Sequence, residues 1–226
     1  DHKKQISKVI GEIEKRDIKN IYFVACGGSL AALGLGEYFI DKEVKVPSKI
    51  CTSNEFIHRD PELVDKDTLV ITRSHSGTTP ETIEATKFAR SKGALTVSIS
   101  MDKDSPLCKE AEFIIDYDYK DDKENRIYNL NGDIGMYWYF IFKLINLFES
   151  KEKYVRILKQ LNNLEKIIKL NKEKIFTKAD QFAKKNKRED IIYTMASGVY
   201  YNEAYAFTSC LLMEMLWIHS NAIHSG

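Results

Sequence analysis

The 226-residue sequence lacks the features that mark membrane and nucleic-acid-binding proteins. Its most apolar segment, residues 134–148, is interrupted by Lys143 and Asn146 and is too short to cross a bilayer. Acidic and basic residues nearly cancel, which leaves a net charge of +1 rather than the strongly basic balance of a nucleic-acid-binding domain. We therefore expect neither a membrane nor a nucleic acid among the partners.

Cysteine is scarce, and its spacing excludes the common redox and zinc motifs. Cys26, Cys51, Cys108 and Cys210 stand apart, with no CxxC pair, so we expect reduced thiols in a cytoplasmic protein. The first residues, DHKKQ, are charged and unlike a signal peptide. No histidine has metal-ligand spacing to further donors, so we expect no metal and no other cofactor. The chain has no initial Met and stops at NAIHSG, which suggests that both ends of a longer protein are missing.

Short apolar segments alternate with helical segments through the first half of the chain. Buried strands are expected at residues 20–26, 46–52, 68–74, 94–100 and 112–118. Strands that alternate with helices predict an α/β fold, in which a parallel sheet has helices on both faces.

A second cycle of the same pattern begins near the end of the chain. Residues 133–149 are apolar nearly all round and predict a buried helix, and residues 153–187 predict further helix. A strand at 191–195, a turn at Gly198 and a long helix from about Tyr201 then repeat the order of the first half. We expect two related α/β halves, with residues 1–150 forming the first domain and its linking helix, and residues 151–226 forming a truncated second domain.

Small hydroxyl residues cluster directly after the third expected strand. Ser74, Ser76 and Thr79 surround Gly77, and Pro80 suits the first position of the helix that follows. Thr79 then becomes the N-cap, whose hydroxyl can accept a hydrogen bond from the first helical turn. Hydroxyls at a helix N-terminus suit a phosphate monoester. The alternative is an ordinary capped helix after a polar loop.

Two further features could contribute to the same site. Gly28 and Ser29 follow the first strand without forming a GxGxxG or Walker A motif, so they are either a second wall of the pocket or a tight turn. Glu214 lies among apolar residues of the last helix, where burial would raise its pKa toward the range useful for proton transfer. The alternative places Glu214 at the helix edge with its carboxylate in solvent. His75 could contact a ligand, although a lone histidine more often does not.

The segments CGGS (residues 26–29) and SHSGTTPET (residues 74–82) resemble the sugar isomerase (SIS) domain, whose phosphate loop reads S-x-S-G-x-T. The resemblance covers essentially the whole chain. It implies a flavodoxin-like α/β/α sandwich in each half, a phosphosugar ligand, and a homodimer that shares its active sites. The loop corresponds to Ser74, His75, Ser76, Gly77, Thr78 and Thr79.

The last helix resembles the segment of glucosamine-6-phosphate synthase that carries a catalytic glutamate, and Glu214 matches that residue. Phe207 and Leu211 stand where the synthase has an acidic residue and a lysine, which argues against the synthase reaction. Together with NEFIHRDPELVD at residues 54–65, this segment is closer to the fructosamine-6-phosphate deglycases.

The deglycase resemblance implies cleavage of a 6-phosphorylated Amadori compound to a hexose 6-phosphate and an amine. Glu214 would move the proton, and Gly28, Ser29 and Asn54 would contact the sugar. An aldose-ketose isomerase, an amino-sugar-phosphate deaminase and a non-catalytic phosphosugar sensor are the alternatives.

Overall fold

The computed structural model describes residues 2–120 and 127–226, and its main feature is a five-stranded parallel sheet. The strands are β1 (Asn20–Ala25), β2 (Ser48–Thr52), β3 (Thr68–Arg73), β4 (Leu95–Ser100) and β5 (Phe113–Asp116). Their order is β2-β1-β3-β4-β5, and each neighbouring pair is parallel. This is the order of flavodoxin-like folds, so the predicted fold of the first half is confirmed.

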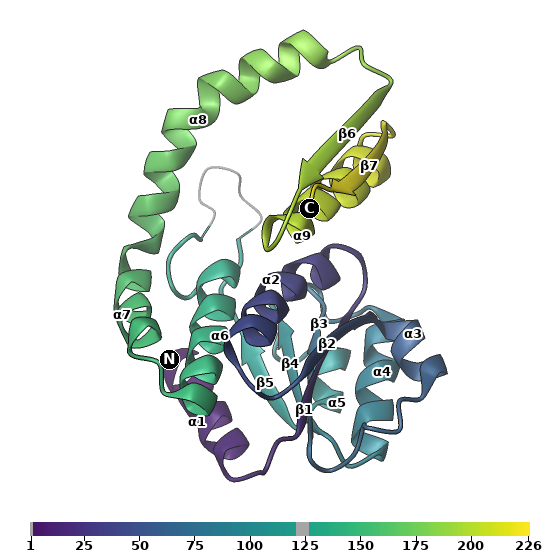
Figure 1. Ribbon diagram of the computed structural model, residues 1–226, viewed down its shortest axis with the longest axis vertical. Coiled ribbons are helices and arrows are strands. Elements are labelled where there is room, and N and C mark those ends of the chain that lie inside the picture. The colour runs from purple at the N-terminus through teal and green to yellow at the C-terminus, as the bar shows by residue number, and fades with distance from the viewer. Residues whose placement is uncertain (1, 121–126) are drawn as a thin grey trace.

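Helices cover both faces of this sheet (Figure 1). One face packs against α1 (His2–Glu14), α2 (Gly27–Glu43) and α6 (Asp133–Glu149), and the other packs against α3 (Ser53–Arg59), α4 (Pro80–Ser91) and α5 (Pro106–Glu110). Every residue of β1, β3 and β4 is buried, as expected of strands that are covered on both sides. Helix α6 buries eight residues, which agrees with its apolar sequence.

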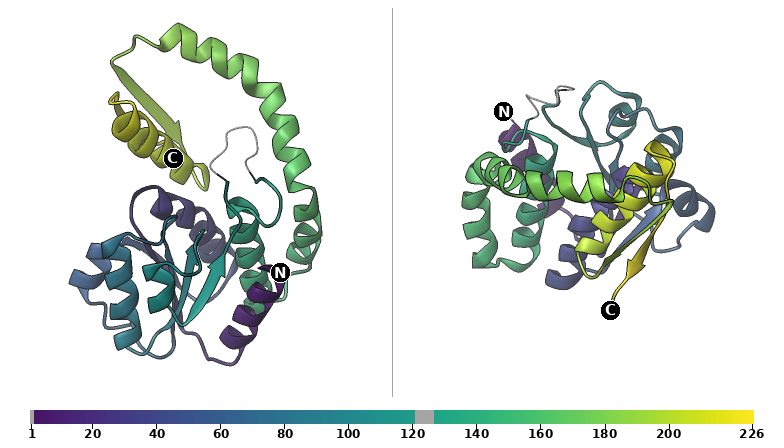
Figure 2. Two further views of the ribbon diagram at one scale, coloured as in Figure 1. Left: turned by 180° about the vertical axis from the view of Figure 1, so that it is seen from behind. Right: turned by 90° about the horizontal axis from the view of Figure 1, so that it is seen from above.

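A long helical arm leads from this body to a smaller second unit (Figures 1 and 2). The arm consists of α7 (Glu152–Gln160), a 3₁₀ turn η1 (Leu161–Asn163) and α8 (Leu164–Asn186), and no residue of α8 is buried. The second unit contains β6 (Ile191–Ala196), α9 (Tyr200–Tyr205), a π-helical continuation η2 (Ala206–Met215) and β7 (His219–His224). The chain thus folds back toward the first unit, where α9 and η2 pack against α2.

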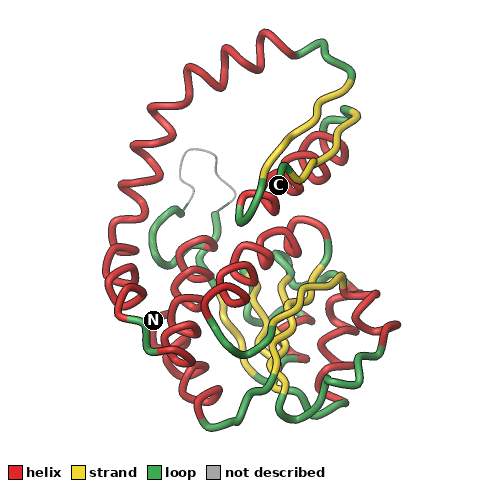
Figure 3. Tube along the Cα trace, in the orientation of Figure 1, coloured by secondary structure: helices red, strands yellow, loops and turns green. Residues whose placement is uncertain are grey.

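The end of the chain differs from the long helix that we expected. The helix stops at Met215, and Trp217 adopts a left-handed conformation with φ of 59°. Residues 219–224 form β7, which pairs in parallel with β6 (Figure 3). The prediction missed this because β7 is formed by its pairing with β6, a contact between segments that are distant in the sequence. Within the described residues, the second unit therefore has a two-stranded sheet and one continuous helical segment, formed by α9 and η2.

A buried carboxylate joins the end of α2 to the start of α7 and makes stability depend on pH. Glu43, whose side chain is 9% exposed, accepts hydrogen bonds at 2.7 Å from Nζ of Lys151 and at 2.7 Å from Nζ of Lys153. These bonds, that of Lys151 first, lower the pKa of Glu43 to about 2 from its ordinary value of 4.5. The folded protein therefore resists protonation of Glu43 at a pH where the unfolded chain takes up the proton.

We expect the stabilisation by Glu43 to be complete above pH 4.5 and to disappear as the pH falls toward 2. Its size is at most about 3 kcal/mol in the free energy of unfolding. Urea unfolding measured between pH 7 and pH 3 should show a shallower loss for Glu43→Gln than for the wild type. The control Glu165→Gln removes an exposed ion pair with Lys169 and should leave the pH dependence unchanged. Equal slopes for wild type and Glu43→Gln would contradict the prediction.

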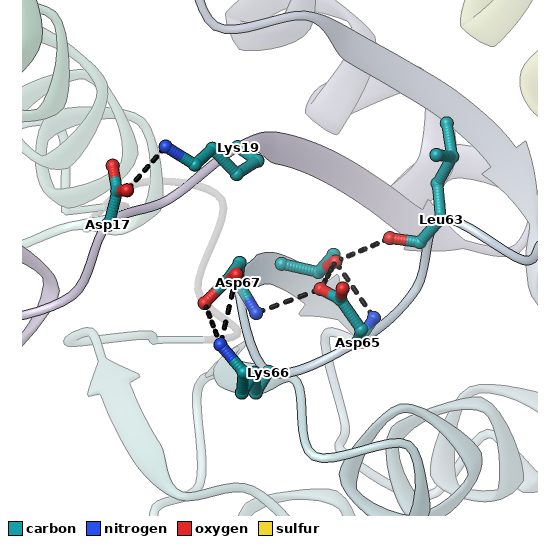
Figure 4. Close-up of polar contacts among 7 residues, drawn as sticks. Asp17, Lys19, Leu63, Asp65, Lys66 and Asp67 are labelled. Atoms are coloured by element: carbon teal, nitrogen blue, oxygen red, sulfur yellow. Dashed lines mark hydrogen bonds and ion pairs between the residues drawn. The ribbon is translucent and has the colours of Figure 1, made fainter.

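Polar contacts close the amino-terminal edge of the sheet (Figure 4). Oγ1 of Thr68, the first residue of β3, donates to the Leu63 carbonyl at 2.8 Å and accepts from the Asp65 amide at 3.0 Å. The Asp67 amide donates to the Asp65 carboxylate at 2.9 Å, and the Asp67 carbonyl accepts from the Lys19 amide at 2.8 Å. These contacts fix the start of β3, at the opposite end of the strand from the hydroxyl cluster.

Candidate functional site

The loop after β3 forms a compact network of hydroxyl groups. Oγ of Ser74 lies 2.8 Å from Oγ1 of Thr79, and Oγ of Ser76 lies 2.7 Å from Oγ1 of Thr78. The Gly77 amide donates to Oγ of Ser74 at 3.1 Å. Ser76 and Thr78 are exposed, whereas Ser74 and Gly77 are buried. The hydroxyls of Ser76 and Thr78 therefore face solvent, while the buried Ser74 and Gly77 fix the backbone of the loop beneath them.

Gly77 is required by both its conformation and its surroundings. Its φ is +69°, which side-chain-bearing residues rarely adopt, and a Cβ would lie 2.1 Å from Oγ of Ser105. Its carbonyl accepts from the Leu107 amide at 3.0 Å, and the His75 carbonyl accepts from the Met101 amide at 3.1 Å. The loop is thus held against the segment that follows β4.

Thr79 is the N-cap of α4 and Pro80 is its first residue, as the sequence predicted. The expected capping bond from the Thr79 hydroxyl to the helix is absent, however, because this hydroxyl contacts Ser74 instead. The backbone carbonyl of Thr79 accepts from the amides of Thr82 and Ile83, both at 3.1 Å. The Thr79 side chain therefore belongs to the loop network rather than to the helix cap.

A cavity of about 390 Å³, widely open to solvent, lies beside this loop between the two units of the chain. Its walls come from the start of α2, the end of β3, the start of α6 and the end of η2. Four of the predicted site residues line it, namely Gly28, Ser29, His75 and Glu214. The other lining residues are Cys26, Arg73, Asp133, Cys210 and Met215. Its volume falls within the usual range for small-molecule sites.

Close contact between helices places Glu214 at this cavity. At Gly34 of α2, a Cβ would lie 2.2 Å from Oδ1 of Asn202 on α9, and at Gly28 it would lie 3.7 Å from Sγ of Cys210 on η2. Burial and the Glu214 charge raise the pKa of the Cys210 thiol. All four cysteines are free, and Cys51 and Cys108 are buried away from the cavity.

Two predicted site features differ from expectation. Glu214 is exposed, so the interpretation that places this carboxylate at the helix edge is the correct one. Only Thr208 and Leu212 are buried in η2. Its large apolar residues are exposed, namely Phe207, Leu211, Met213 and Met215. Asn54 is exposed on the first turn of α3 and does not line the cavity.

Charged residues that the sequence did not reveal complete one wall, and two tyrosines contact residues of this wall from behind. Nη2 of Arg73 lies 2.6 Å from both carboxylate oxygens of Asp133, and its Cζ lies 5.5 Å from the Tyr137 ring centroid. Nδ1 of His75 lies 2.7 Å from the Tyr117 hydroxyl. Burial raises the pKa of Tyr117, so this phenol keeps its proton. The sequence contained one signal that could have identified this wall: Arg73, a charged residue, ends an apolar strand directly before the hydroxyl cluster.

The flavodoxin-like sheet and the hydroxyl-rich loop after β3 are the features expected of a SIS domain, and comparison with known families gives the same result. The family model for the SIS domain matches residues 16–137, which is more than half of the chain. The chain belongs to the SIS domain family, and the predicted resemblance is confirmed.

Particular relatives are similar to the chain over almost all of its length. Fructosamine deglycase from Bacillus subtilis (strain 168) is 38% identical over 99% of the chain and 67% of the relative. Fructoselysine 6-phosphate deglycase from Escherichia coli (strain K12) is 30% identical over 98% of the chain and 63% of the relative. The chain thus spans about two thirds of the length of these two proteins.

Solved structures show the same fold. A candidate phosphosugar isomerase from Bacillus subtilis superimposes with a TM-score of 0.92 at 38% identity, covering 99% of the chain and 67% of that structure. The C-terminal domain of glucosamine-fructose-6-phosphate aminotransferase from Francisella tularensis has a TM-score of 0.79 at 23% identity, covering 97% of the chain and 61% of that structure.

Among residues 2–120 and 127–226, no helix has both the length and the apolar character of a membrane span.

Proposed function

We propose that the full-length protein is a deglycase that cleaves a 6-phosphorylated Amadori compound to a hexose 6-phosphate and a free amine. The observation that carries the proposal is the cavity, in which Glu214 lies beside the predicted sugar-binding residues Gly28 and Ser29 and beside His75 of the phosphate loop. Both relatives described above are named as deglycases, and one is named for fructoselysine 6-phosphate.

The phosphate group binds at the loop in this proposal. Hydroxyls of Ser74, Ser76 and Thr79 contact its oxygens, and the positive end of the α4 dipole faces the charge. The Ser76 and Thr78 hydroxyls, which hydrogen bond to each other at an exposed position, can turn toward a ligand. The open-chain sugar then extends toward Gly28 and Ser29, with Asn54 contacting a more distant part of the substrate.

Glu214 transfers the proton in the proposed reaction. Its carboxylate takes a proton from C1 while the C2 oxygen gains a proton from water, giving an enaminol. Glu214 then returns its proton to C2 and the nitrogen loses a proton to water, giving an imine at C1 that water hydrolyses to the sugar and the amine. Glu214 is exposed at the cavity, where its carboxylate can reach a bound substrate and act as a general base.

An assay that separates the products tests the proposal. We expect the full-length protein, incubated with a panel of phosphorylated Amadori compounds, to release glucose 6-phosphate and a stoichiometric amount of amino acid. The unphosphorylated compounds are the control and should react much more slowly. Release of ammonia would identify a deaminase, isomerised sugar alone an isomerase, and thermal stabilisation by the compound without any product a sensor. Each of these outcomes would contradict the deglycase.

We also propose that the protein is a homodimer with active sites at the subunit contact. Large apolar side chains remain exposed on the arm and the second unit, and among them are Phe176, Phe182, Met195 and Trp217. Exposed large apolar side chains are frequent on surfaces that bind another chain, which is what supports this proposal.

A further inference from the structure

Arg73 is a buried cation in the wall of the cavity that also contains Glu214. Its relative exposure is 6%, yet it lines the cavity together with His75 and Asp133. Strand β3 ends at Arg73, one residue before the phosphate loop begins, so its backbone position is fixed by the sheet. A guanidinium carries its charge throughout the physiological pH range.

The contacts of Arg73 orient its guanidinium without using every donor. Nη2 is bound to both Asp133 oxygens at 2.6 Å, and the Tyr137 ring lies 5.5 Å from Cζ. Nε, by contrast, is buried and has no hydrogen-bond partner among the described residues. A buried N–H without a partner is uncommon in folded proteins, so the environment of Arg73 needs an explanation beyond its ion pair.

The proposed reaction requires a group of this kind. When Glu214 takes the C1 proton, the C–H bonding pair becomes the C1=C2 double bond and the carbonyl π pair moves onto the C2 oxygen. Negative charge therefore develops on that oxygen, and a fixed hydrogen-bond donor that faces it lowers the barrier. Glu214 acts on the proton at C1, so another group must stabilise the charge on the C2 oxygen.

We propose that Arg73 is a further catalytic residue, whose guanidinium binds the C2 oxygen and stabilises its developing negative charge while Glu214 removes the C1 proton. The inference rests on the proposed deglycase function. Asp133 is a positioning residue in this arrangement, because it holds the guanidinium from the side of α6. The competing explanation is that the ion pair only anchors α6 to β3.

Two variants of the full-length protein separate these explanations. The double variant Arg73→Met/Asp133→Leu removes both charges together. Removal of Arg73 alone would leave Asp133 without its partner, whereas exchange of a whole buried ion pair for apolar residues is often neutral for stability. The conservative variant Arg73→Lys keeps a cation at the same place but loses the planar set of donors. Melting temperature and the affinity for glucose 6-phosphate serve as measures of folding and ground-state binding.

We expect the double variant to lower kcat by about 10²-fold or more with less than about 5-fold change in KM, as for the loss of an oxyanion donor. Arg73→Lys should show a smaller loss. With substrate deuterated at C1, the isotope effect on kcat should increase in both variants, because proton removal becomes slower relative to the other steps. A purely structural role would leave this isotope effect unchanged.

Near wild-type kcat in either variant would overturn the inference. So would a fall in kcat that comes with a parallel loss of melting temperature or of glucose 6-phosphate affinity and with an unchanged isotope effect. If the double variant does not fold, Arg73→Lys alone decides between the two explanations. Failure of the wild type to release amine would instead overturn the proposed function, and this is seen before any variant is compared.

Discussion

Replacement of Glu214 by Gln is expected to lower kcat for the phosphorylated Amadori compound by about 10³-fold. Glutamine keeps the size and the hydrogen bonding of the side chain but cannot accept the C1 proton, and a positioned general base contributes about 10²–10⁴-fold to a rate. Because Glu214 is exposed and few contacts depend on it, the protein should fold normally. Steady-state kinetics of the full-length variant, with calorimetric binding of glucose 6-phosphate, measure both effects.

The same helical segment offers a matched control for this experiment. Glu203 on α9 is also exposed but does not line the cavity, so Glu203→Gln should retain wild-type kcat and KM. Substantial turnover by Glu214→Gln would remove Glu214 from the mechanism. Loss of glucose 6-phosphate binding along with turnover would indicate that Glu214 shapes the site rather than transfers the proton.

The phosphate loop gives the second large expected effect. The double variant Ser76→Ala/Thr79→Ala should raise KM for the phosphorylated substrate by about 30-fold or more. Each lost hydrogen bond to a charged group is worth about 1.5–3 kcal/mol, and about 1.4 kcal/mol corresponds to a factor of ten in binding. The unphosphorylated analogue should show almost no change in KM, because it makes no contact with the loop.

A hydroxyl at the other end of the same strand controls for general destabilisation. Thr68→Val removes the Oγ1 contacts to Leu63 and Asp65 at the amino end of β3. We expect a loss of about 1–3 kcal/mol in the free energy of unfolding with no change in KM. An equal rise in KM for both substrates of the loop variant would show that its hydroxyls support the fold instead of binding phosphate.

Local sequence signals were sufficient for the first half of the fold. Continuous apolar strands indicated burial on both faces, and Pro80 with Thr79 placed the start of α4 at the correct residue. The loop after β3 was predictable for the same reason, since all of its residues are contiguous. Local sequence patterns depend on residues that are close together along the chain. The hydrogen bonds within the loop join residues at most five positions apart, so its structure could be predicted from such patterns.

Contacts between distant segments could not be predicted in this way. The Arg73–Asp133 pair joins residues 60 positions apart, and the sequence around either residue does not indicate that the other is its partner. The exposure of Glu214 depends on how η2 packs against α2, through positions such as Gly28. The end of the helix at Met215 likewise depends on the pairing of β7 with β6, which is a tertiary contact.

The exposed arm has a consequence for the synthesis of the protein. The phosphate loop and its sheet leave the ribosome well before Glu214, because α7 and α8 are translated between them. At about 5–20 residues per second, the first unit exists for on the order of ten seconds before η2 can dock on α2. If Glu214 transfers the proton as proposed, the nascent chain in this interval has the phosphate loop but lacks its general base, and it becomes active only after the second unit has packed against the first.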